Sequence, residues 1–441
     1  MQTPEQMLEL AHQVVGRAKE LGADEVAAMV SRGSHVTVQR RGGKVETATE
    51  ATTRGLVVSV LRGDCYSSNS TSDLRPDALD SFLKRCVGAT EYLEPDPYRR
   101  QPDIELCGRG VSVEQLDQDD PAWAEHTAEA RAVQAEAIES RLVGRRSDII
   151  SCSSYVADGR SESVQVMSNG FVGVDAGAWF AAGGDMTLEE GDRRPESGAY
   201  YGARYLSDLP TPDAIADEIE RRVAERLGSK AAPSGTYPMV LANRSAGRIL
   251  GVLGGPLSGS SLHEHLSCLE GKLGERIGSS VFTLVDDPTI PRGLGSRPWD
   301  GDTLRAKPRT IVQNGVLEQY NINVYYGRKL GVEPTSGGRS NWVVPPGDVP
   351  TAELLAGLPK AILVTGFLGG NSNGSTGDFS FGIRGLLLEH GQVVGSLSEM
   401  NVTGSITDIF QRLVAVGDDP WPWSSVRSPT LIFDDVQFSG T

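Results

Sequence analysis

The stretch DIISCSSYVADGRSESVQVMSNGFVGVDAGAWFAAGG, residues 148–184, is the part of the chain that decides the fold. Short runs of strand-forming residues in it are separated by dipeptides that are typical of tight turns. The two clearest are Asp158-Gly159 and Asn169-Gly170. Such pairs favour two-residue hairpin connections, because both positions tolerate a positive φ. The stretch therefore predicts an antiparallel meander with a turn at each pair.

Helices are expected on both sides of this meander. The alanine-rich segment 121–142 precedes it, and segment 211–228, which begins with Thr211 and Pro212, follows it. Threonine followed by proline is a common helix start, since threonine caps the free N–H groups and proline needs none. The next residues, SKAAPSGT at 229–236, have the composition of a linker. We therefore expect two domains, residues 1–230 and 231–441.

The first hundred residues predict the order helix, three strands, helix. The opening helix has Thr3 as its cap, Pro4 at its first position, Gln6 three residues after the cap and Gly22 just beyond its end. Alternating or β-branched runs then predict the strands, and a second amphipathic pattern predicts the next helix. The expected strands occupy residues 25–33, 35–52 and 54–64, and the helix occupies residues 75–90.

Hairpins dominate the second half of the sequence. The units TIVQNGVLEQYNI (residues 310–322) and GLLLEHGQVVGSLSEM (residues 385–400) place apolar strands on either side of Asn314-Gly315 and His390-Gly391. Helices alternate with blocks of hairpins and do not follow a regular βαβ rhythm. The predicted fold class is α+β, with mainly antiparallel sheets and flanking helices.

Composition narrows the range of functions. The 441 residues include 42 Lys and Arg against 58 Asp and Glu, a formal charge of −16. A phosphate backbone would be repelled by this overall field, so nucleic acid is not an expected partner. No signal peptide or membrane-spanning run is visible, and the five scattered cysteines contain no CxxC pair. These features predict a cytoplasmic protein without a membrane partner.

The segment SSLHEHLSCLEGKLGER, residues 260–276, concentrates potential metal ligands. His263 and His265 are two residues apart, about 200° around a helix, and His263 and Cys268 are five apart, about 140° around it. Neither pair shares one face of a regular helix, and the HExxH spacing of many zinc hydrolases is absent. A strand or an irregular loop could still bring the three together. A polar surface is the simpler interpretation.

Two other stretches have chemistry-bearing residues. GNSNGSTGDFSFG, residues 370–382, lacks the lysine of a phosphate-binding loop, so a turn before a strand is the favoured interpretation. Asp286, Asp287, Asp300 and Asp302 alternate with Pro and Gly, a pattern more typical of turns and caps than of a magnesium or acid–base site.

From residue 267 to residue 336 the sequence resembles the TldD/PmbA family, specifically its PmbA (TldE) branch. The resemblance continues through SNW at 340–342, TGDFSFGIRGLLLEHGQVVGSLSEMNVTGSITDIFQRLVAVGDD at 376–419 and SPTLIFDDVQFSG at 428–440. The first half agrees more loosely, through GADEVAAMVSRG, RGLVVSVLRGD, NSTSDLRPDALDSFLKRCVGAT and EPDPY. The similarity thus extends over nearly the whole chain.

The resemblance implies a cytosolic zinc metallopeptidase that works as a heterodimer on small or unfolded peptides, or that matures a peptide-derived product. In this family the TldD-like subunit carries an HExxxH motif and a late cysteine ligand, whereas the TldE-like subunit lacks them. When HEHLSC is aligned on that motif, Cys268 stands in place of the second histidine, and no later cysteine exists. Alignment on GKLG instead makes the stretch a non-metal position, and the long downstream match favours this second register.

The first hypothesis is therefore a supporting subunit without its own metal, which needs a TldD-like partner that holds the zinc. One alternative is a self-sufficient zinc hydrolase that uses His263, His265 and Cys268 as ligands and Glu264 as the general base. Another is a non-enzymatic, peptide-binding homodimer. An extended peptide would add as a strand to a sheet edge. The expected substrate-channel residues are Asn371, Asn373, Ser375, Thr376, Asp378 and Ser380.

Overall fold

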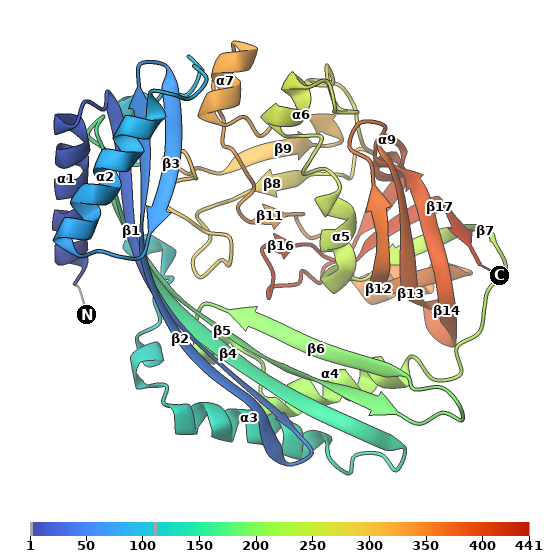
Figure 1. Cartoon of the computed structure of the whole chain (residues 1–441). Helices are drawn as coiled ribbons and strands as arrows, with labels where there is room; N and C mark the ends of the chain where they lie inside the picture. The colour runs from blue at the N-terminus through green and yellow to red at the C-terminus, as the bar shows by residue number, and fades with distance from the viewer. Residues whose placement is uncertain (1–2, 110–112, 441) are drawn as a thin grey trace.

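The computed structural model describes residues 3–109 and 113–440. A long, strongly bent antiparallel sheet formed by the first half of the chain wraps around one side of a second, β-rich half (Figure 1). Almost all strand pairings are antiparallel, and helices flank the sheets. The predicted α+β class is confirmed.

The first sheet has six strands in the order β3-β2-β1-β4-β5-β6. Its strands are β1 (Glu25–Arg41), β2 (Lys44–Arg62), β3 (Cys65–Thr71), β4 (Ile149–Met167), β5 (Val172–Leu188) and β6 (Glu196–Ala203). The longest, β2 and β4, have 19 residues each, or roughly 60 Å at about 3.3 Å per residue. The sheet is therefore long enough to carry a pair of helices at each end.

Three strands precede residue 75, as expected in number, but the stretches predicted as three strands form only β1 and β2, and β3 lies outside the predicted ranges. β1 runs without interruption through Gly33, where the sequence predicted a break. The chain turns instead at Gly42 and Gly43, which have φ values of 61° and 75°. Two consecutive positive φ values are the requirement of a tight hairpin turn, and glycine meets it at little cost.

The two turns predicted in the meander had different outcomes. Asn169-Gly170 does connect β4 to β5, with Gly170 at φ 97° and the Asn169 side chain accepting from the Phe171 N–H at 3.0 Å. The prediction at Asp158-Gly159 was wrong, because β4 continues straight through both residues. Asp158 is fully buried and bound by Arg131 from a neighbouring helix. A tertiary ion pair thus replaces the local turn.

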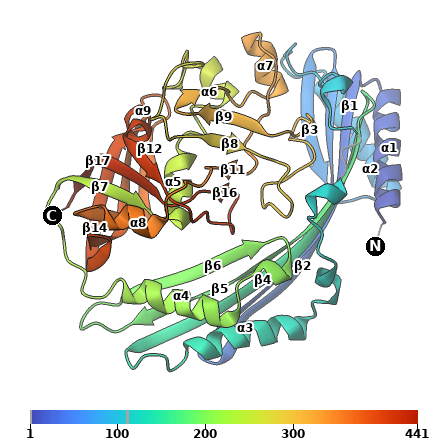
Figure 2. The same ribbon diagram turned by 180° about the vertical axis from the view of Figure 1, so that it is seen from behind.

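The helices of this half lie on the outer face of the bent sheet (Figure 2). At one end, α1 (Pro4–Glu20) and α2 (Pro76–Thr90) enclose a core with the adjoining strands. At the other end, α3 (Ala128–Leu142) and α4 (Pro212–Ala224) do the same. The capping box of α1 forms as predicted, with Gln6 and Thr3 bound reciprocally.

Helix α3 begins later than the sequence predicted. Residues Pro121–Glu125 form a separate 3₁₀ helix, and Thr127 caps α3 by accepting from the Ala130 N–H at 3.1 Å. The alanine-rich composition of residues 121–142 therefore predicted one continuous helix where there are two. The helix is interrupted because the Thr127 side chain caps a new helix start.

The second half contains two further sheets. One has the order β10-β9-β8-β11-β16 and the other β14-β13-β12-β7-β17-β15. An additional pairing of β14 with β17 closes β14, β13, β12, β7 and β17 into a ring. The strands of the ring sheet are β7 (Gly235–Leu241), β12 (Ala361–Ser372), β13 (Asp378–Glu389), β14 (Gln392–Ser405), β15 (Leu413–Val416) and β17 (Leu431–Ser439).

The smaller sheet and several short helices complete this half. Its strands are β8 (Leu284–Asp286), β9 (Arg309–Gln313), β10 (Val316–Leu317), β11 (Trp342–Val343) and β16 (Val426–Arg427). The helices are α5 (Ala246–Gly251), α6 (Gly259–His263), α7 (Val324–Leu330), α8 (Thr351–Ala356) and α9 (Ile406–Ile409). A large shared core includes the fully buried Trp342 and the stacked rings of Phe282 and Phe410, with centroids 4.5 Å apart.

Both hairpins predicted in the second half are present. Asn314-Gly315 joins β9 to β10, and His390-Gly391 joins β13 to β14. All four residues have positive φ, between 48° and 83°, which matches the tight turns whose twist suits paired strands.

The two halves contact each other at several places. Arg328 donates to the carbonyls of Tyr98, Arg100 and Gln101, and the indole of Trp423 donates to the Asp208 carbonyl. The division between residues 230 and 231 stays a prediction. Within residues 3–109 and 113–440, none of the helices is both long and apolar enough to cross a membrane.

Candidate functional site

The histidine-rich segment lies at the end of the short helix α6. Ser258 caps this helix, His263 is its last residue, and His265 reverses the chain with φ 55°. The His263 ring packs beside the ring of Tyr326, with centroids 5.9 Å apart. The His265 side chain is 79% exposed and its Nδ1 lies 2.7 Å from Oε1 of Glu270. The two histidines therefore have different neighbours, and Glu264 lies on the surface between them.

Cys268 is half-buried below this surface. Its backbone N–H donates to the Gly374 carbonyl at 2.9 Å. Burial raises the pKa of the Cys268 thiol, and the nearby Asp378 carboxylate adds to the rise. At neutral pH the side chain is therefore a protonated thiol, whereas zinc takes a thiolate.

These donors do not fit a zinc ion as the chain arranges them. Among the described residues, no three His, Cys, Asp or Glu side chains are grouped so that they could hold a metal ion. The His263 ring contacts the ring of Tyr326, and His265 is hydrogen-bonded to Glu270. Cys268 packs against the hydrophobic core. Whether this segment takes up zinc stays a prediction to be measured.

The six residues predicted to line a substrate channel lie on the hairpin of β12 and β13. The stretch read as a loop is mostly strand: Asn371 belongs to β12, Asp378 and Ser380 belong to β13, and only residues 373–377 form the turn. Asn371 and Ser380 are cross-strand partners. Both side chains are exposed.

The other predicted channel residues build the turn at the tip of this hairpin. The Asn373 N–H donates to the Asp378 carbonyl at 2.8 Å, and the Asn373 side chain accepts from the Ser375 N–H at 2.9 Å. Thr376 Oγ1 accepts from the Asp378 N–H at 3.3 Å. These groups are therefore partly used to fix the turn.

The hairpin tip touches the histidine-rich segment. Besides the bond from Cys268 to Gly374, Ser375 Oγ donates to the Leu266 carbonyl at 3.4 Å. Glycine is required at position 377, which has φ 86° and would bring a Cβ within 3.3 Å of Cys268 Sγ. The structure thus joins two stretches that the sequence analysis treated separately.

Strand β12 has an incompletely paired edge. Its Ile362–Val364 portion pairs with β7, and beyond Val364 no strand in the described part of the chain pairs with that edge, although Ser245 and Arg248 donate to the carbonyls of Thr365 and Gly370. A groove of about 400 Å³ lies over the neighbouring strands β12, β13 and β14, lined by Leu368, Gly369, Gly370, Asn371, Ser380, Gly382 and Asn401. Three glycines in this lining leave room for another backbone to approach. Two predicted channel residues, Asn371 and Ser380, therefore border an actual groove.

The four aspartates of segment 285–302 have structural roles. Asp286 is buried and accepts from Arg309 and from the Ser340 N–H, the latter at 2.6 Å. Asp287, Asp300 and Asp302 accept from backbone N–H groups of nearby turns and of helix α7. These are the turn and cap roles that the sequence predicted, with a buried ion pair added at Asp286.

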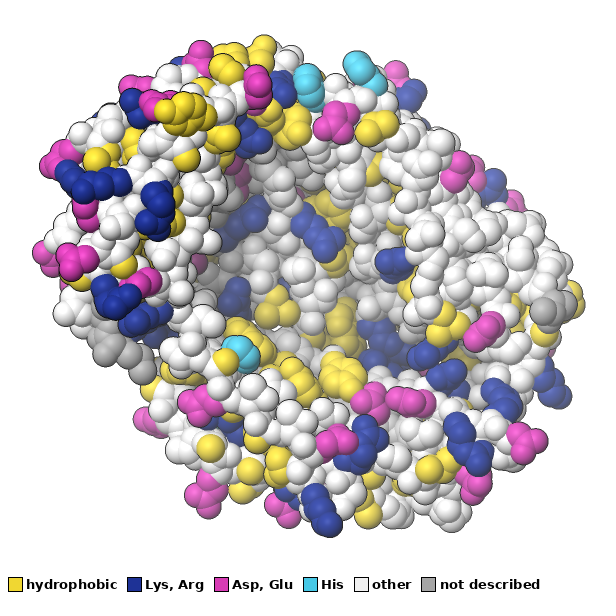
Figure 3. All heavy atoms as spheres, viewed as in Figure 1, with side chains coloured by type: hydrophobic (Ala, Val, Ile, Leu, Met, Phe, Trp, Pro, Cys, Tyr) yellow, Lys and Arg dark blue, Asp and Glu magenta, His cyan; other side chains and the backbone are white. Residues whose placement is uncertain are grey.

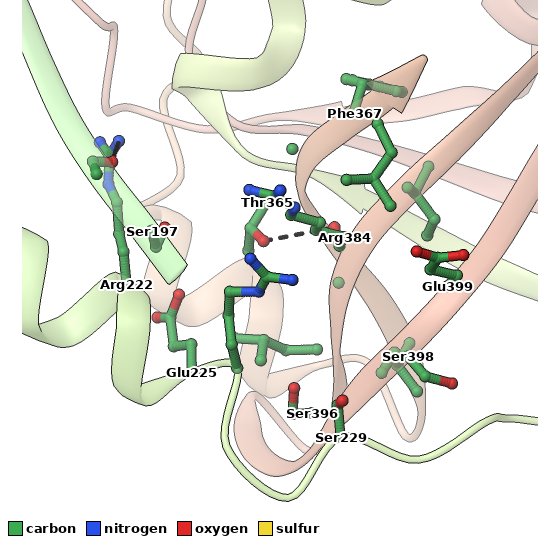
Figure 4. A pocket seen from close by; sticks show the side chains of 18 of the residues that line it. Ser197, Arg222, Glu225, Ser229, Thr365, Phe367, Arg384, Ser396, Ser398 and Glu399 are labelled. Atoms are coloured by element: carbon green, nitrogen blue, oxygen red, sulfur yellow. Dashed lines mark hydrogen bonds between the residues drawn. The ribbon is translucent and has the colours of Figure 1, made fainter. Parts of the chain in front are cut away.

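Sequence analysis missed a second cavity, of about 480 Å³, between the two halves of the chain (Figure 4). Arginines from separate elements line it: Arg193, Arg222, Arg226, Arg244 and Arg384. Only the segment ERRVAER at 220–226 gave a local sign of it, because the other arginines are distant in sequence. Figure 3 shows Lys and Arg side chains gathered around a hollow in the middle of the molecule, although the chain carries a charge of −16.

Comparisons with known proteins match most of the chain. The family model described as PmbA/TldA metallopeptidase C-terminal domain matches residues 234–440, and the one described as PmbA/TldA metallopeptidase domain 1 matches residues 26–90. Metalloprotease PmbA of Escherichia coli O157:H7 is 25% identical over 438 residues, which cover 98% of this chain and 96% of that protein.

Two solved structures have the same fold. A protein from Bacteroides thetaiotaomicron, described as a modulator of DNA gyrase, superimposes with a TM-score of 0.96 at 35% identity, covering 100% of both chains. TldE from Thermococcus kodakarensis superimposes with a TM-score of 0.86 at 17% identity and covers 98% of this chain and 100% of that one.

Haemophilus influenzae has relatives of two kinds. Its Metalloprotease PmbA homolog is 26% identical over 436 residues, covering 96% of this chain and 94% of the relative. Its Metalloprotease TldD homolog is 26% identical over 255 residues, covering 53% of each chain. Similarity to the PmbA protein thus extends over nearly the whole length, whereas similarity to the TldD protein covers about half.

Proposed function

Because this chain belongs to the PmbA/TldD family of metallopeptidases and is PmbA/TldE-like, we propose that it is a subunit without its own metal site in a cytoplasmic heterodimer. Its TldD-like partner holds the zinc. The complex cleaves small or unfolded peptides, or matures a peptide-derived product. The part of this subunit is to complete the chamber in which an extended peptide is held.

One observation carries the proposal: the potential zinc ligands have separate partners. Zinc sites in proteins use three or four donors at about 2.0–2.3 Å around one point. Here His265 faces Glu270, His263 lies against Tyr326, and Cys268 carries a raised pKa beneath the surface. A site would require three side chains to move and the thiol to ionise, so the chain itself is poorly suited to hold the metal.

The pairing with a TldD-like protein is supported by the relatives. Organisms such as Haemophilus influenzae have both a PmbA homolog and a TldD homolog. A protein that supplied its own metal site would have no need of a second family member for that purpose.

The capacity to hold a peptide is supported by the edge of β12. Strand addition uses main-chain hydrogen bonds, which tolerate many peptide sequences. Beyond Val364 no described strand pairs with this edge, although the carbonyls of Thr365 and Gly370 accept from Ser245 and Arg248, and a glycine-rich groove lies over the adjoining face at Asn371 and Ser380. A metallopeptidase that acts on varied unfolded peptides needs this kind of recognition.

The test is the zinc content of the chain purified alone and after co-expression with a TldD-like protein from the same genome. We expect almost no zinc on the isolated chain and about one ion per heterodimer. His263→Ala and Glu264→Ala should leave the peptidase activity of the heterodimer unchanged. About one zinc on the isolated chain, lost in His263→Ala, would contradict the proposal and make this segment a working metal site.

A further inference from the structure

The arginine-lined cavity lies where the two halves of the chain meet. One wall comes from β6 and the end of α4, with Ser197, Arg222 and Glu225, and the opposite wall comes from β12 and β13, with Thr365 and Arg384 (Figure 4). Neither half forms the cavity alone. Its volume of about 480 Å³ is within the range of small-ligand and peptide-end sites.

Most of the carboxylates around this cavity are already shared; Glu399 of β14 also lines it, and its charge opposes the lowering of the Arg226 pKa. Glu218 accepts from Arg221, Arg222 and Arg244. Burial raises its pKa, but the hydrogen bonds from Arg221 and Arg222 outweigh burial and bring it down to about 2. Glu225 is bound to Arg221, and Glu190 is bound to Arg193. These three acids are therefore engaged with arginines.

Positive charge remains after this pairing. Neither Arg226 nor Arg384 has an ion pair with a carboxylate within the described residues, and Arg226 donates only to the Glu196 carbonyl. Burial lowers the pKa of Arg226, and the charges of Arg384 and Arg193 lower it further. The like charges repel one another, so an anion placed between them would be stabilised.

Two guanidinium nitrogens in the cavity wall are buried and unpaired. Nη2 of Arg222 and Nε of Arg384 have no hydrogen-bond partner in the structure. Leaving such a donor without a partner costs about 1–3 kcal/mol, so these groups are normally satisfied by a ligand or by water. The two arginines come from opposite walls of the cavity, and these two nitrogens lie buried behind its surface.

The cavity adjoins the groove over β12, β13 and β14, because Leu368 lines both. Two apolar residues that are not fully buried, Phe367 and Leu368, accompany the arginines in the cavity. A wall that is partly apolar and partly cationic suits the end of a peptide better than a free inorganic anion, which would gain nothing from the apolar surface.

We propose that this cavity binds the carboxylates of an extended peptide that lies in the groove over β12, β13 and β14, either its C-terminal carboxylate or acidic side chains near that end. The arginine forks recognise carboxylates in the bidentate geometry that lysine does not offer. The inference rests on the proposed peptide-holding role. It adds a preference for anionic peptide ends that a bare strand edge would not have.

The test measures binding of rhodamine-labelled peptides of about ten residues to the purified full chain by fluorescence anisotropy. One peptide alternates Glu and Ala, a second alternates Gln and Ala, and each is made with a free and an amidated C-terminus. The variants are Arg384→Gln and Arg226→Gln. The matched control is Arg75→Gln, whose side chain is 81% exposed in the first half of the chain.

We expect the Glu peptide to bind at least about ten-fold more tightly than the amidated Gln peptide, and Arg384→Gln to remove that advantage. Arg75→Gln should retain the tighter binding of the Glu peptide. Raising the salt from about 50 to about 300 mM should reduce this advantage. If affinity depends only on whether the C-terminus is free, the cavity binds the terminal carboxylate. If the Glu peptide binds equally well with a free and an amidated C-terminus, the cavity binds its acidic side chains.

Equal affinity for the Glu peptide and the amidated Gln peptide, or an undiminished preference in both Arg384→Gln and Arg226→Gln, would overturn the inference. Circular dichroism melting of each variant separates a folding defect from a binding defect, and the second variant retains the test if the first does not fold. Binding is read without cleavage or zinc. The cavity and the supporting-subunit role can therefore fail independently of each other.

Discussion

Arg131 and Asp158 form the most enclosed ion pair of the first half. Nε and Nη2 of Arg131 donate to the two carboxylate oxygens at 2.6 and 2.8 Å, and the Asp158 side chain is 0% exposed. The next residue, Gly159, has to be glycine, because a Cβ at this position would lie 2.6 Å from Nε1 of Trp179 and 2.8 Å from the Ser34 carbonyl. This Asp-Gly pair therefore serves close packing within a strand and not a turn.

Removal of one partner should be costly. Arg131→Met leaves a buried carboxylate without its cation, so we expect a loss of about 3–5 kcal/mol in the free energy of unfolding, measured in urea. Adding Asp158→Asn should recover much of the loss, because no charge then remains to be compensated. The control is Arg75→Ala in the exposed pair with Asp73, which should leave the midpoint unchanged. Similar midpoints for Arg131→Met and the control would contradict this account.

His126 should make the stability depend on pH. Burial lowers its pKa below the ordinary 6.5, although Asp158, 3.9 Å away, opposes the shift. The unfolded chain then binds more protons than the folded chain just below pH 6.5, so this stabilisation is complete above that pH and is lost as the pH falls. His126→Gln should show a smaller drop in unfolding midpoint between about pH 7.5 and 5.5. The exposed His12→Gln variant should behave like the wild type, and equal drops in all three proteins would exclude this role.

At the scale of elements, turn glycines differ in how closely they are packed. Gly315 and Gly43 both have positive φ, 83° and 75°. A Cβ on Gly315 would lie 2.1 Å from the Gly278 carbonyl oxygen, whereas a Cβ on Gly43 would meet nothing within 4 Å. The β9–β10 turn is thus packed against the preceding loop, whereas the space at the Cβ position of Gly43 is open, although its N–H donates to Glu139 at 2.8 Å.

This contrast predicts different costs for the same substitution. Gly43→Ala should cost roughly 1–2 kcal/mol from backbone strain alone. Gly315→Ala carries the same strain and must also displace two carbonyl groups, so we expect an additional loss of about 1–3 kcal/mol in urea unfolding. Equal losses would mean that the loop at Gly278 moves aside without cost.

The sequence predicted elements best where their signals are local. Thr3 and Thr211 mark helices that begin at the expected residues, and Asn169-Gly170 and His390-Gly391 turn as expected. Asp158-Gly159 misled because its partner, Arg131, is 27 residues away. Pairings of that kind depend on tertiary contact and leave no local pattern.

In the candidate site, too, features with a local signal could be predicted and tertiary contacts could not. The substrate-channel role of residues 371–380 stays a prediction, although Asn371 and Ser380 line a groove. The contact between Gly374 and Cys268 joins positions far apart in sequence, which no local pattern indicated. The arginine cavity combines five arginines from both halves of the chain. No single stretch contains enough of them to be recognised, so the cavity could be found only from the fold.

At the scale of the whole molecule, aromatic rings join the two halves of the chain. Trp423 and Trp421, from the end of the chain, pack against Tyr201 of β6, with centroids 5.0 and 5.7 Å from its ring. Trp423 also donates to the Asp208 carbonyl at 3.0 Å. This cluster holds the ring of strands against the long sheet and so preserves the cavity between them.

Trp423→Ala should loosen this contact. We expect a loss of about 2 kcal/mol in stability, roughly half the cost of truncating a fully buried tryptophan, and faster proteolysis within residues 229–236. Limited digestion followed by mass spectrometry would locate the cleavage. Tyr92→Ala, at a side chain 83% exposed, provides the control. An unchanged cleavage rate in Trp423→Ala would show that other contacts suffice to hold the halves together.

The closed ring of strands has a consequence for how the gene could be rearranged. β7 opens the second half of the chain and β17 closes it, yet they are paired neighbours, and Ser234 and Gly440 exchange hydrogen bonds of 3.0 Å. The second half therefore starts and finishes at one point in space. A short bridge could join these two positions, and new ends could be opened at an exposed hairpin such as His390-Gly391. A circularly permuted gene of this kind should encode the same ring, since the order of its strands in space does not depend on where translation begins.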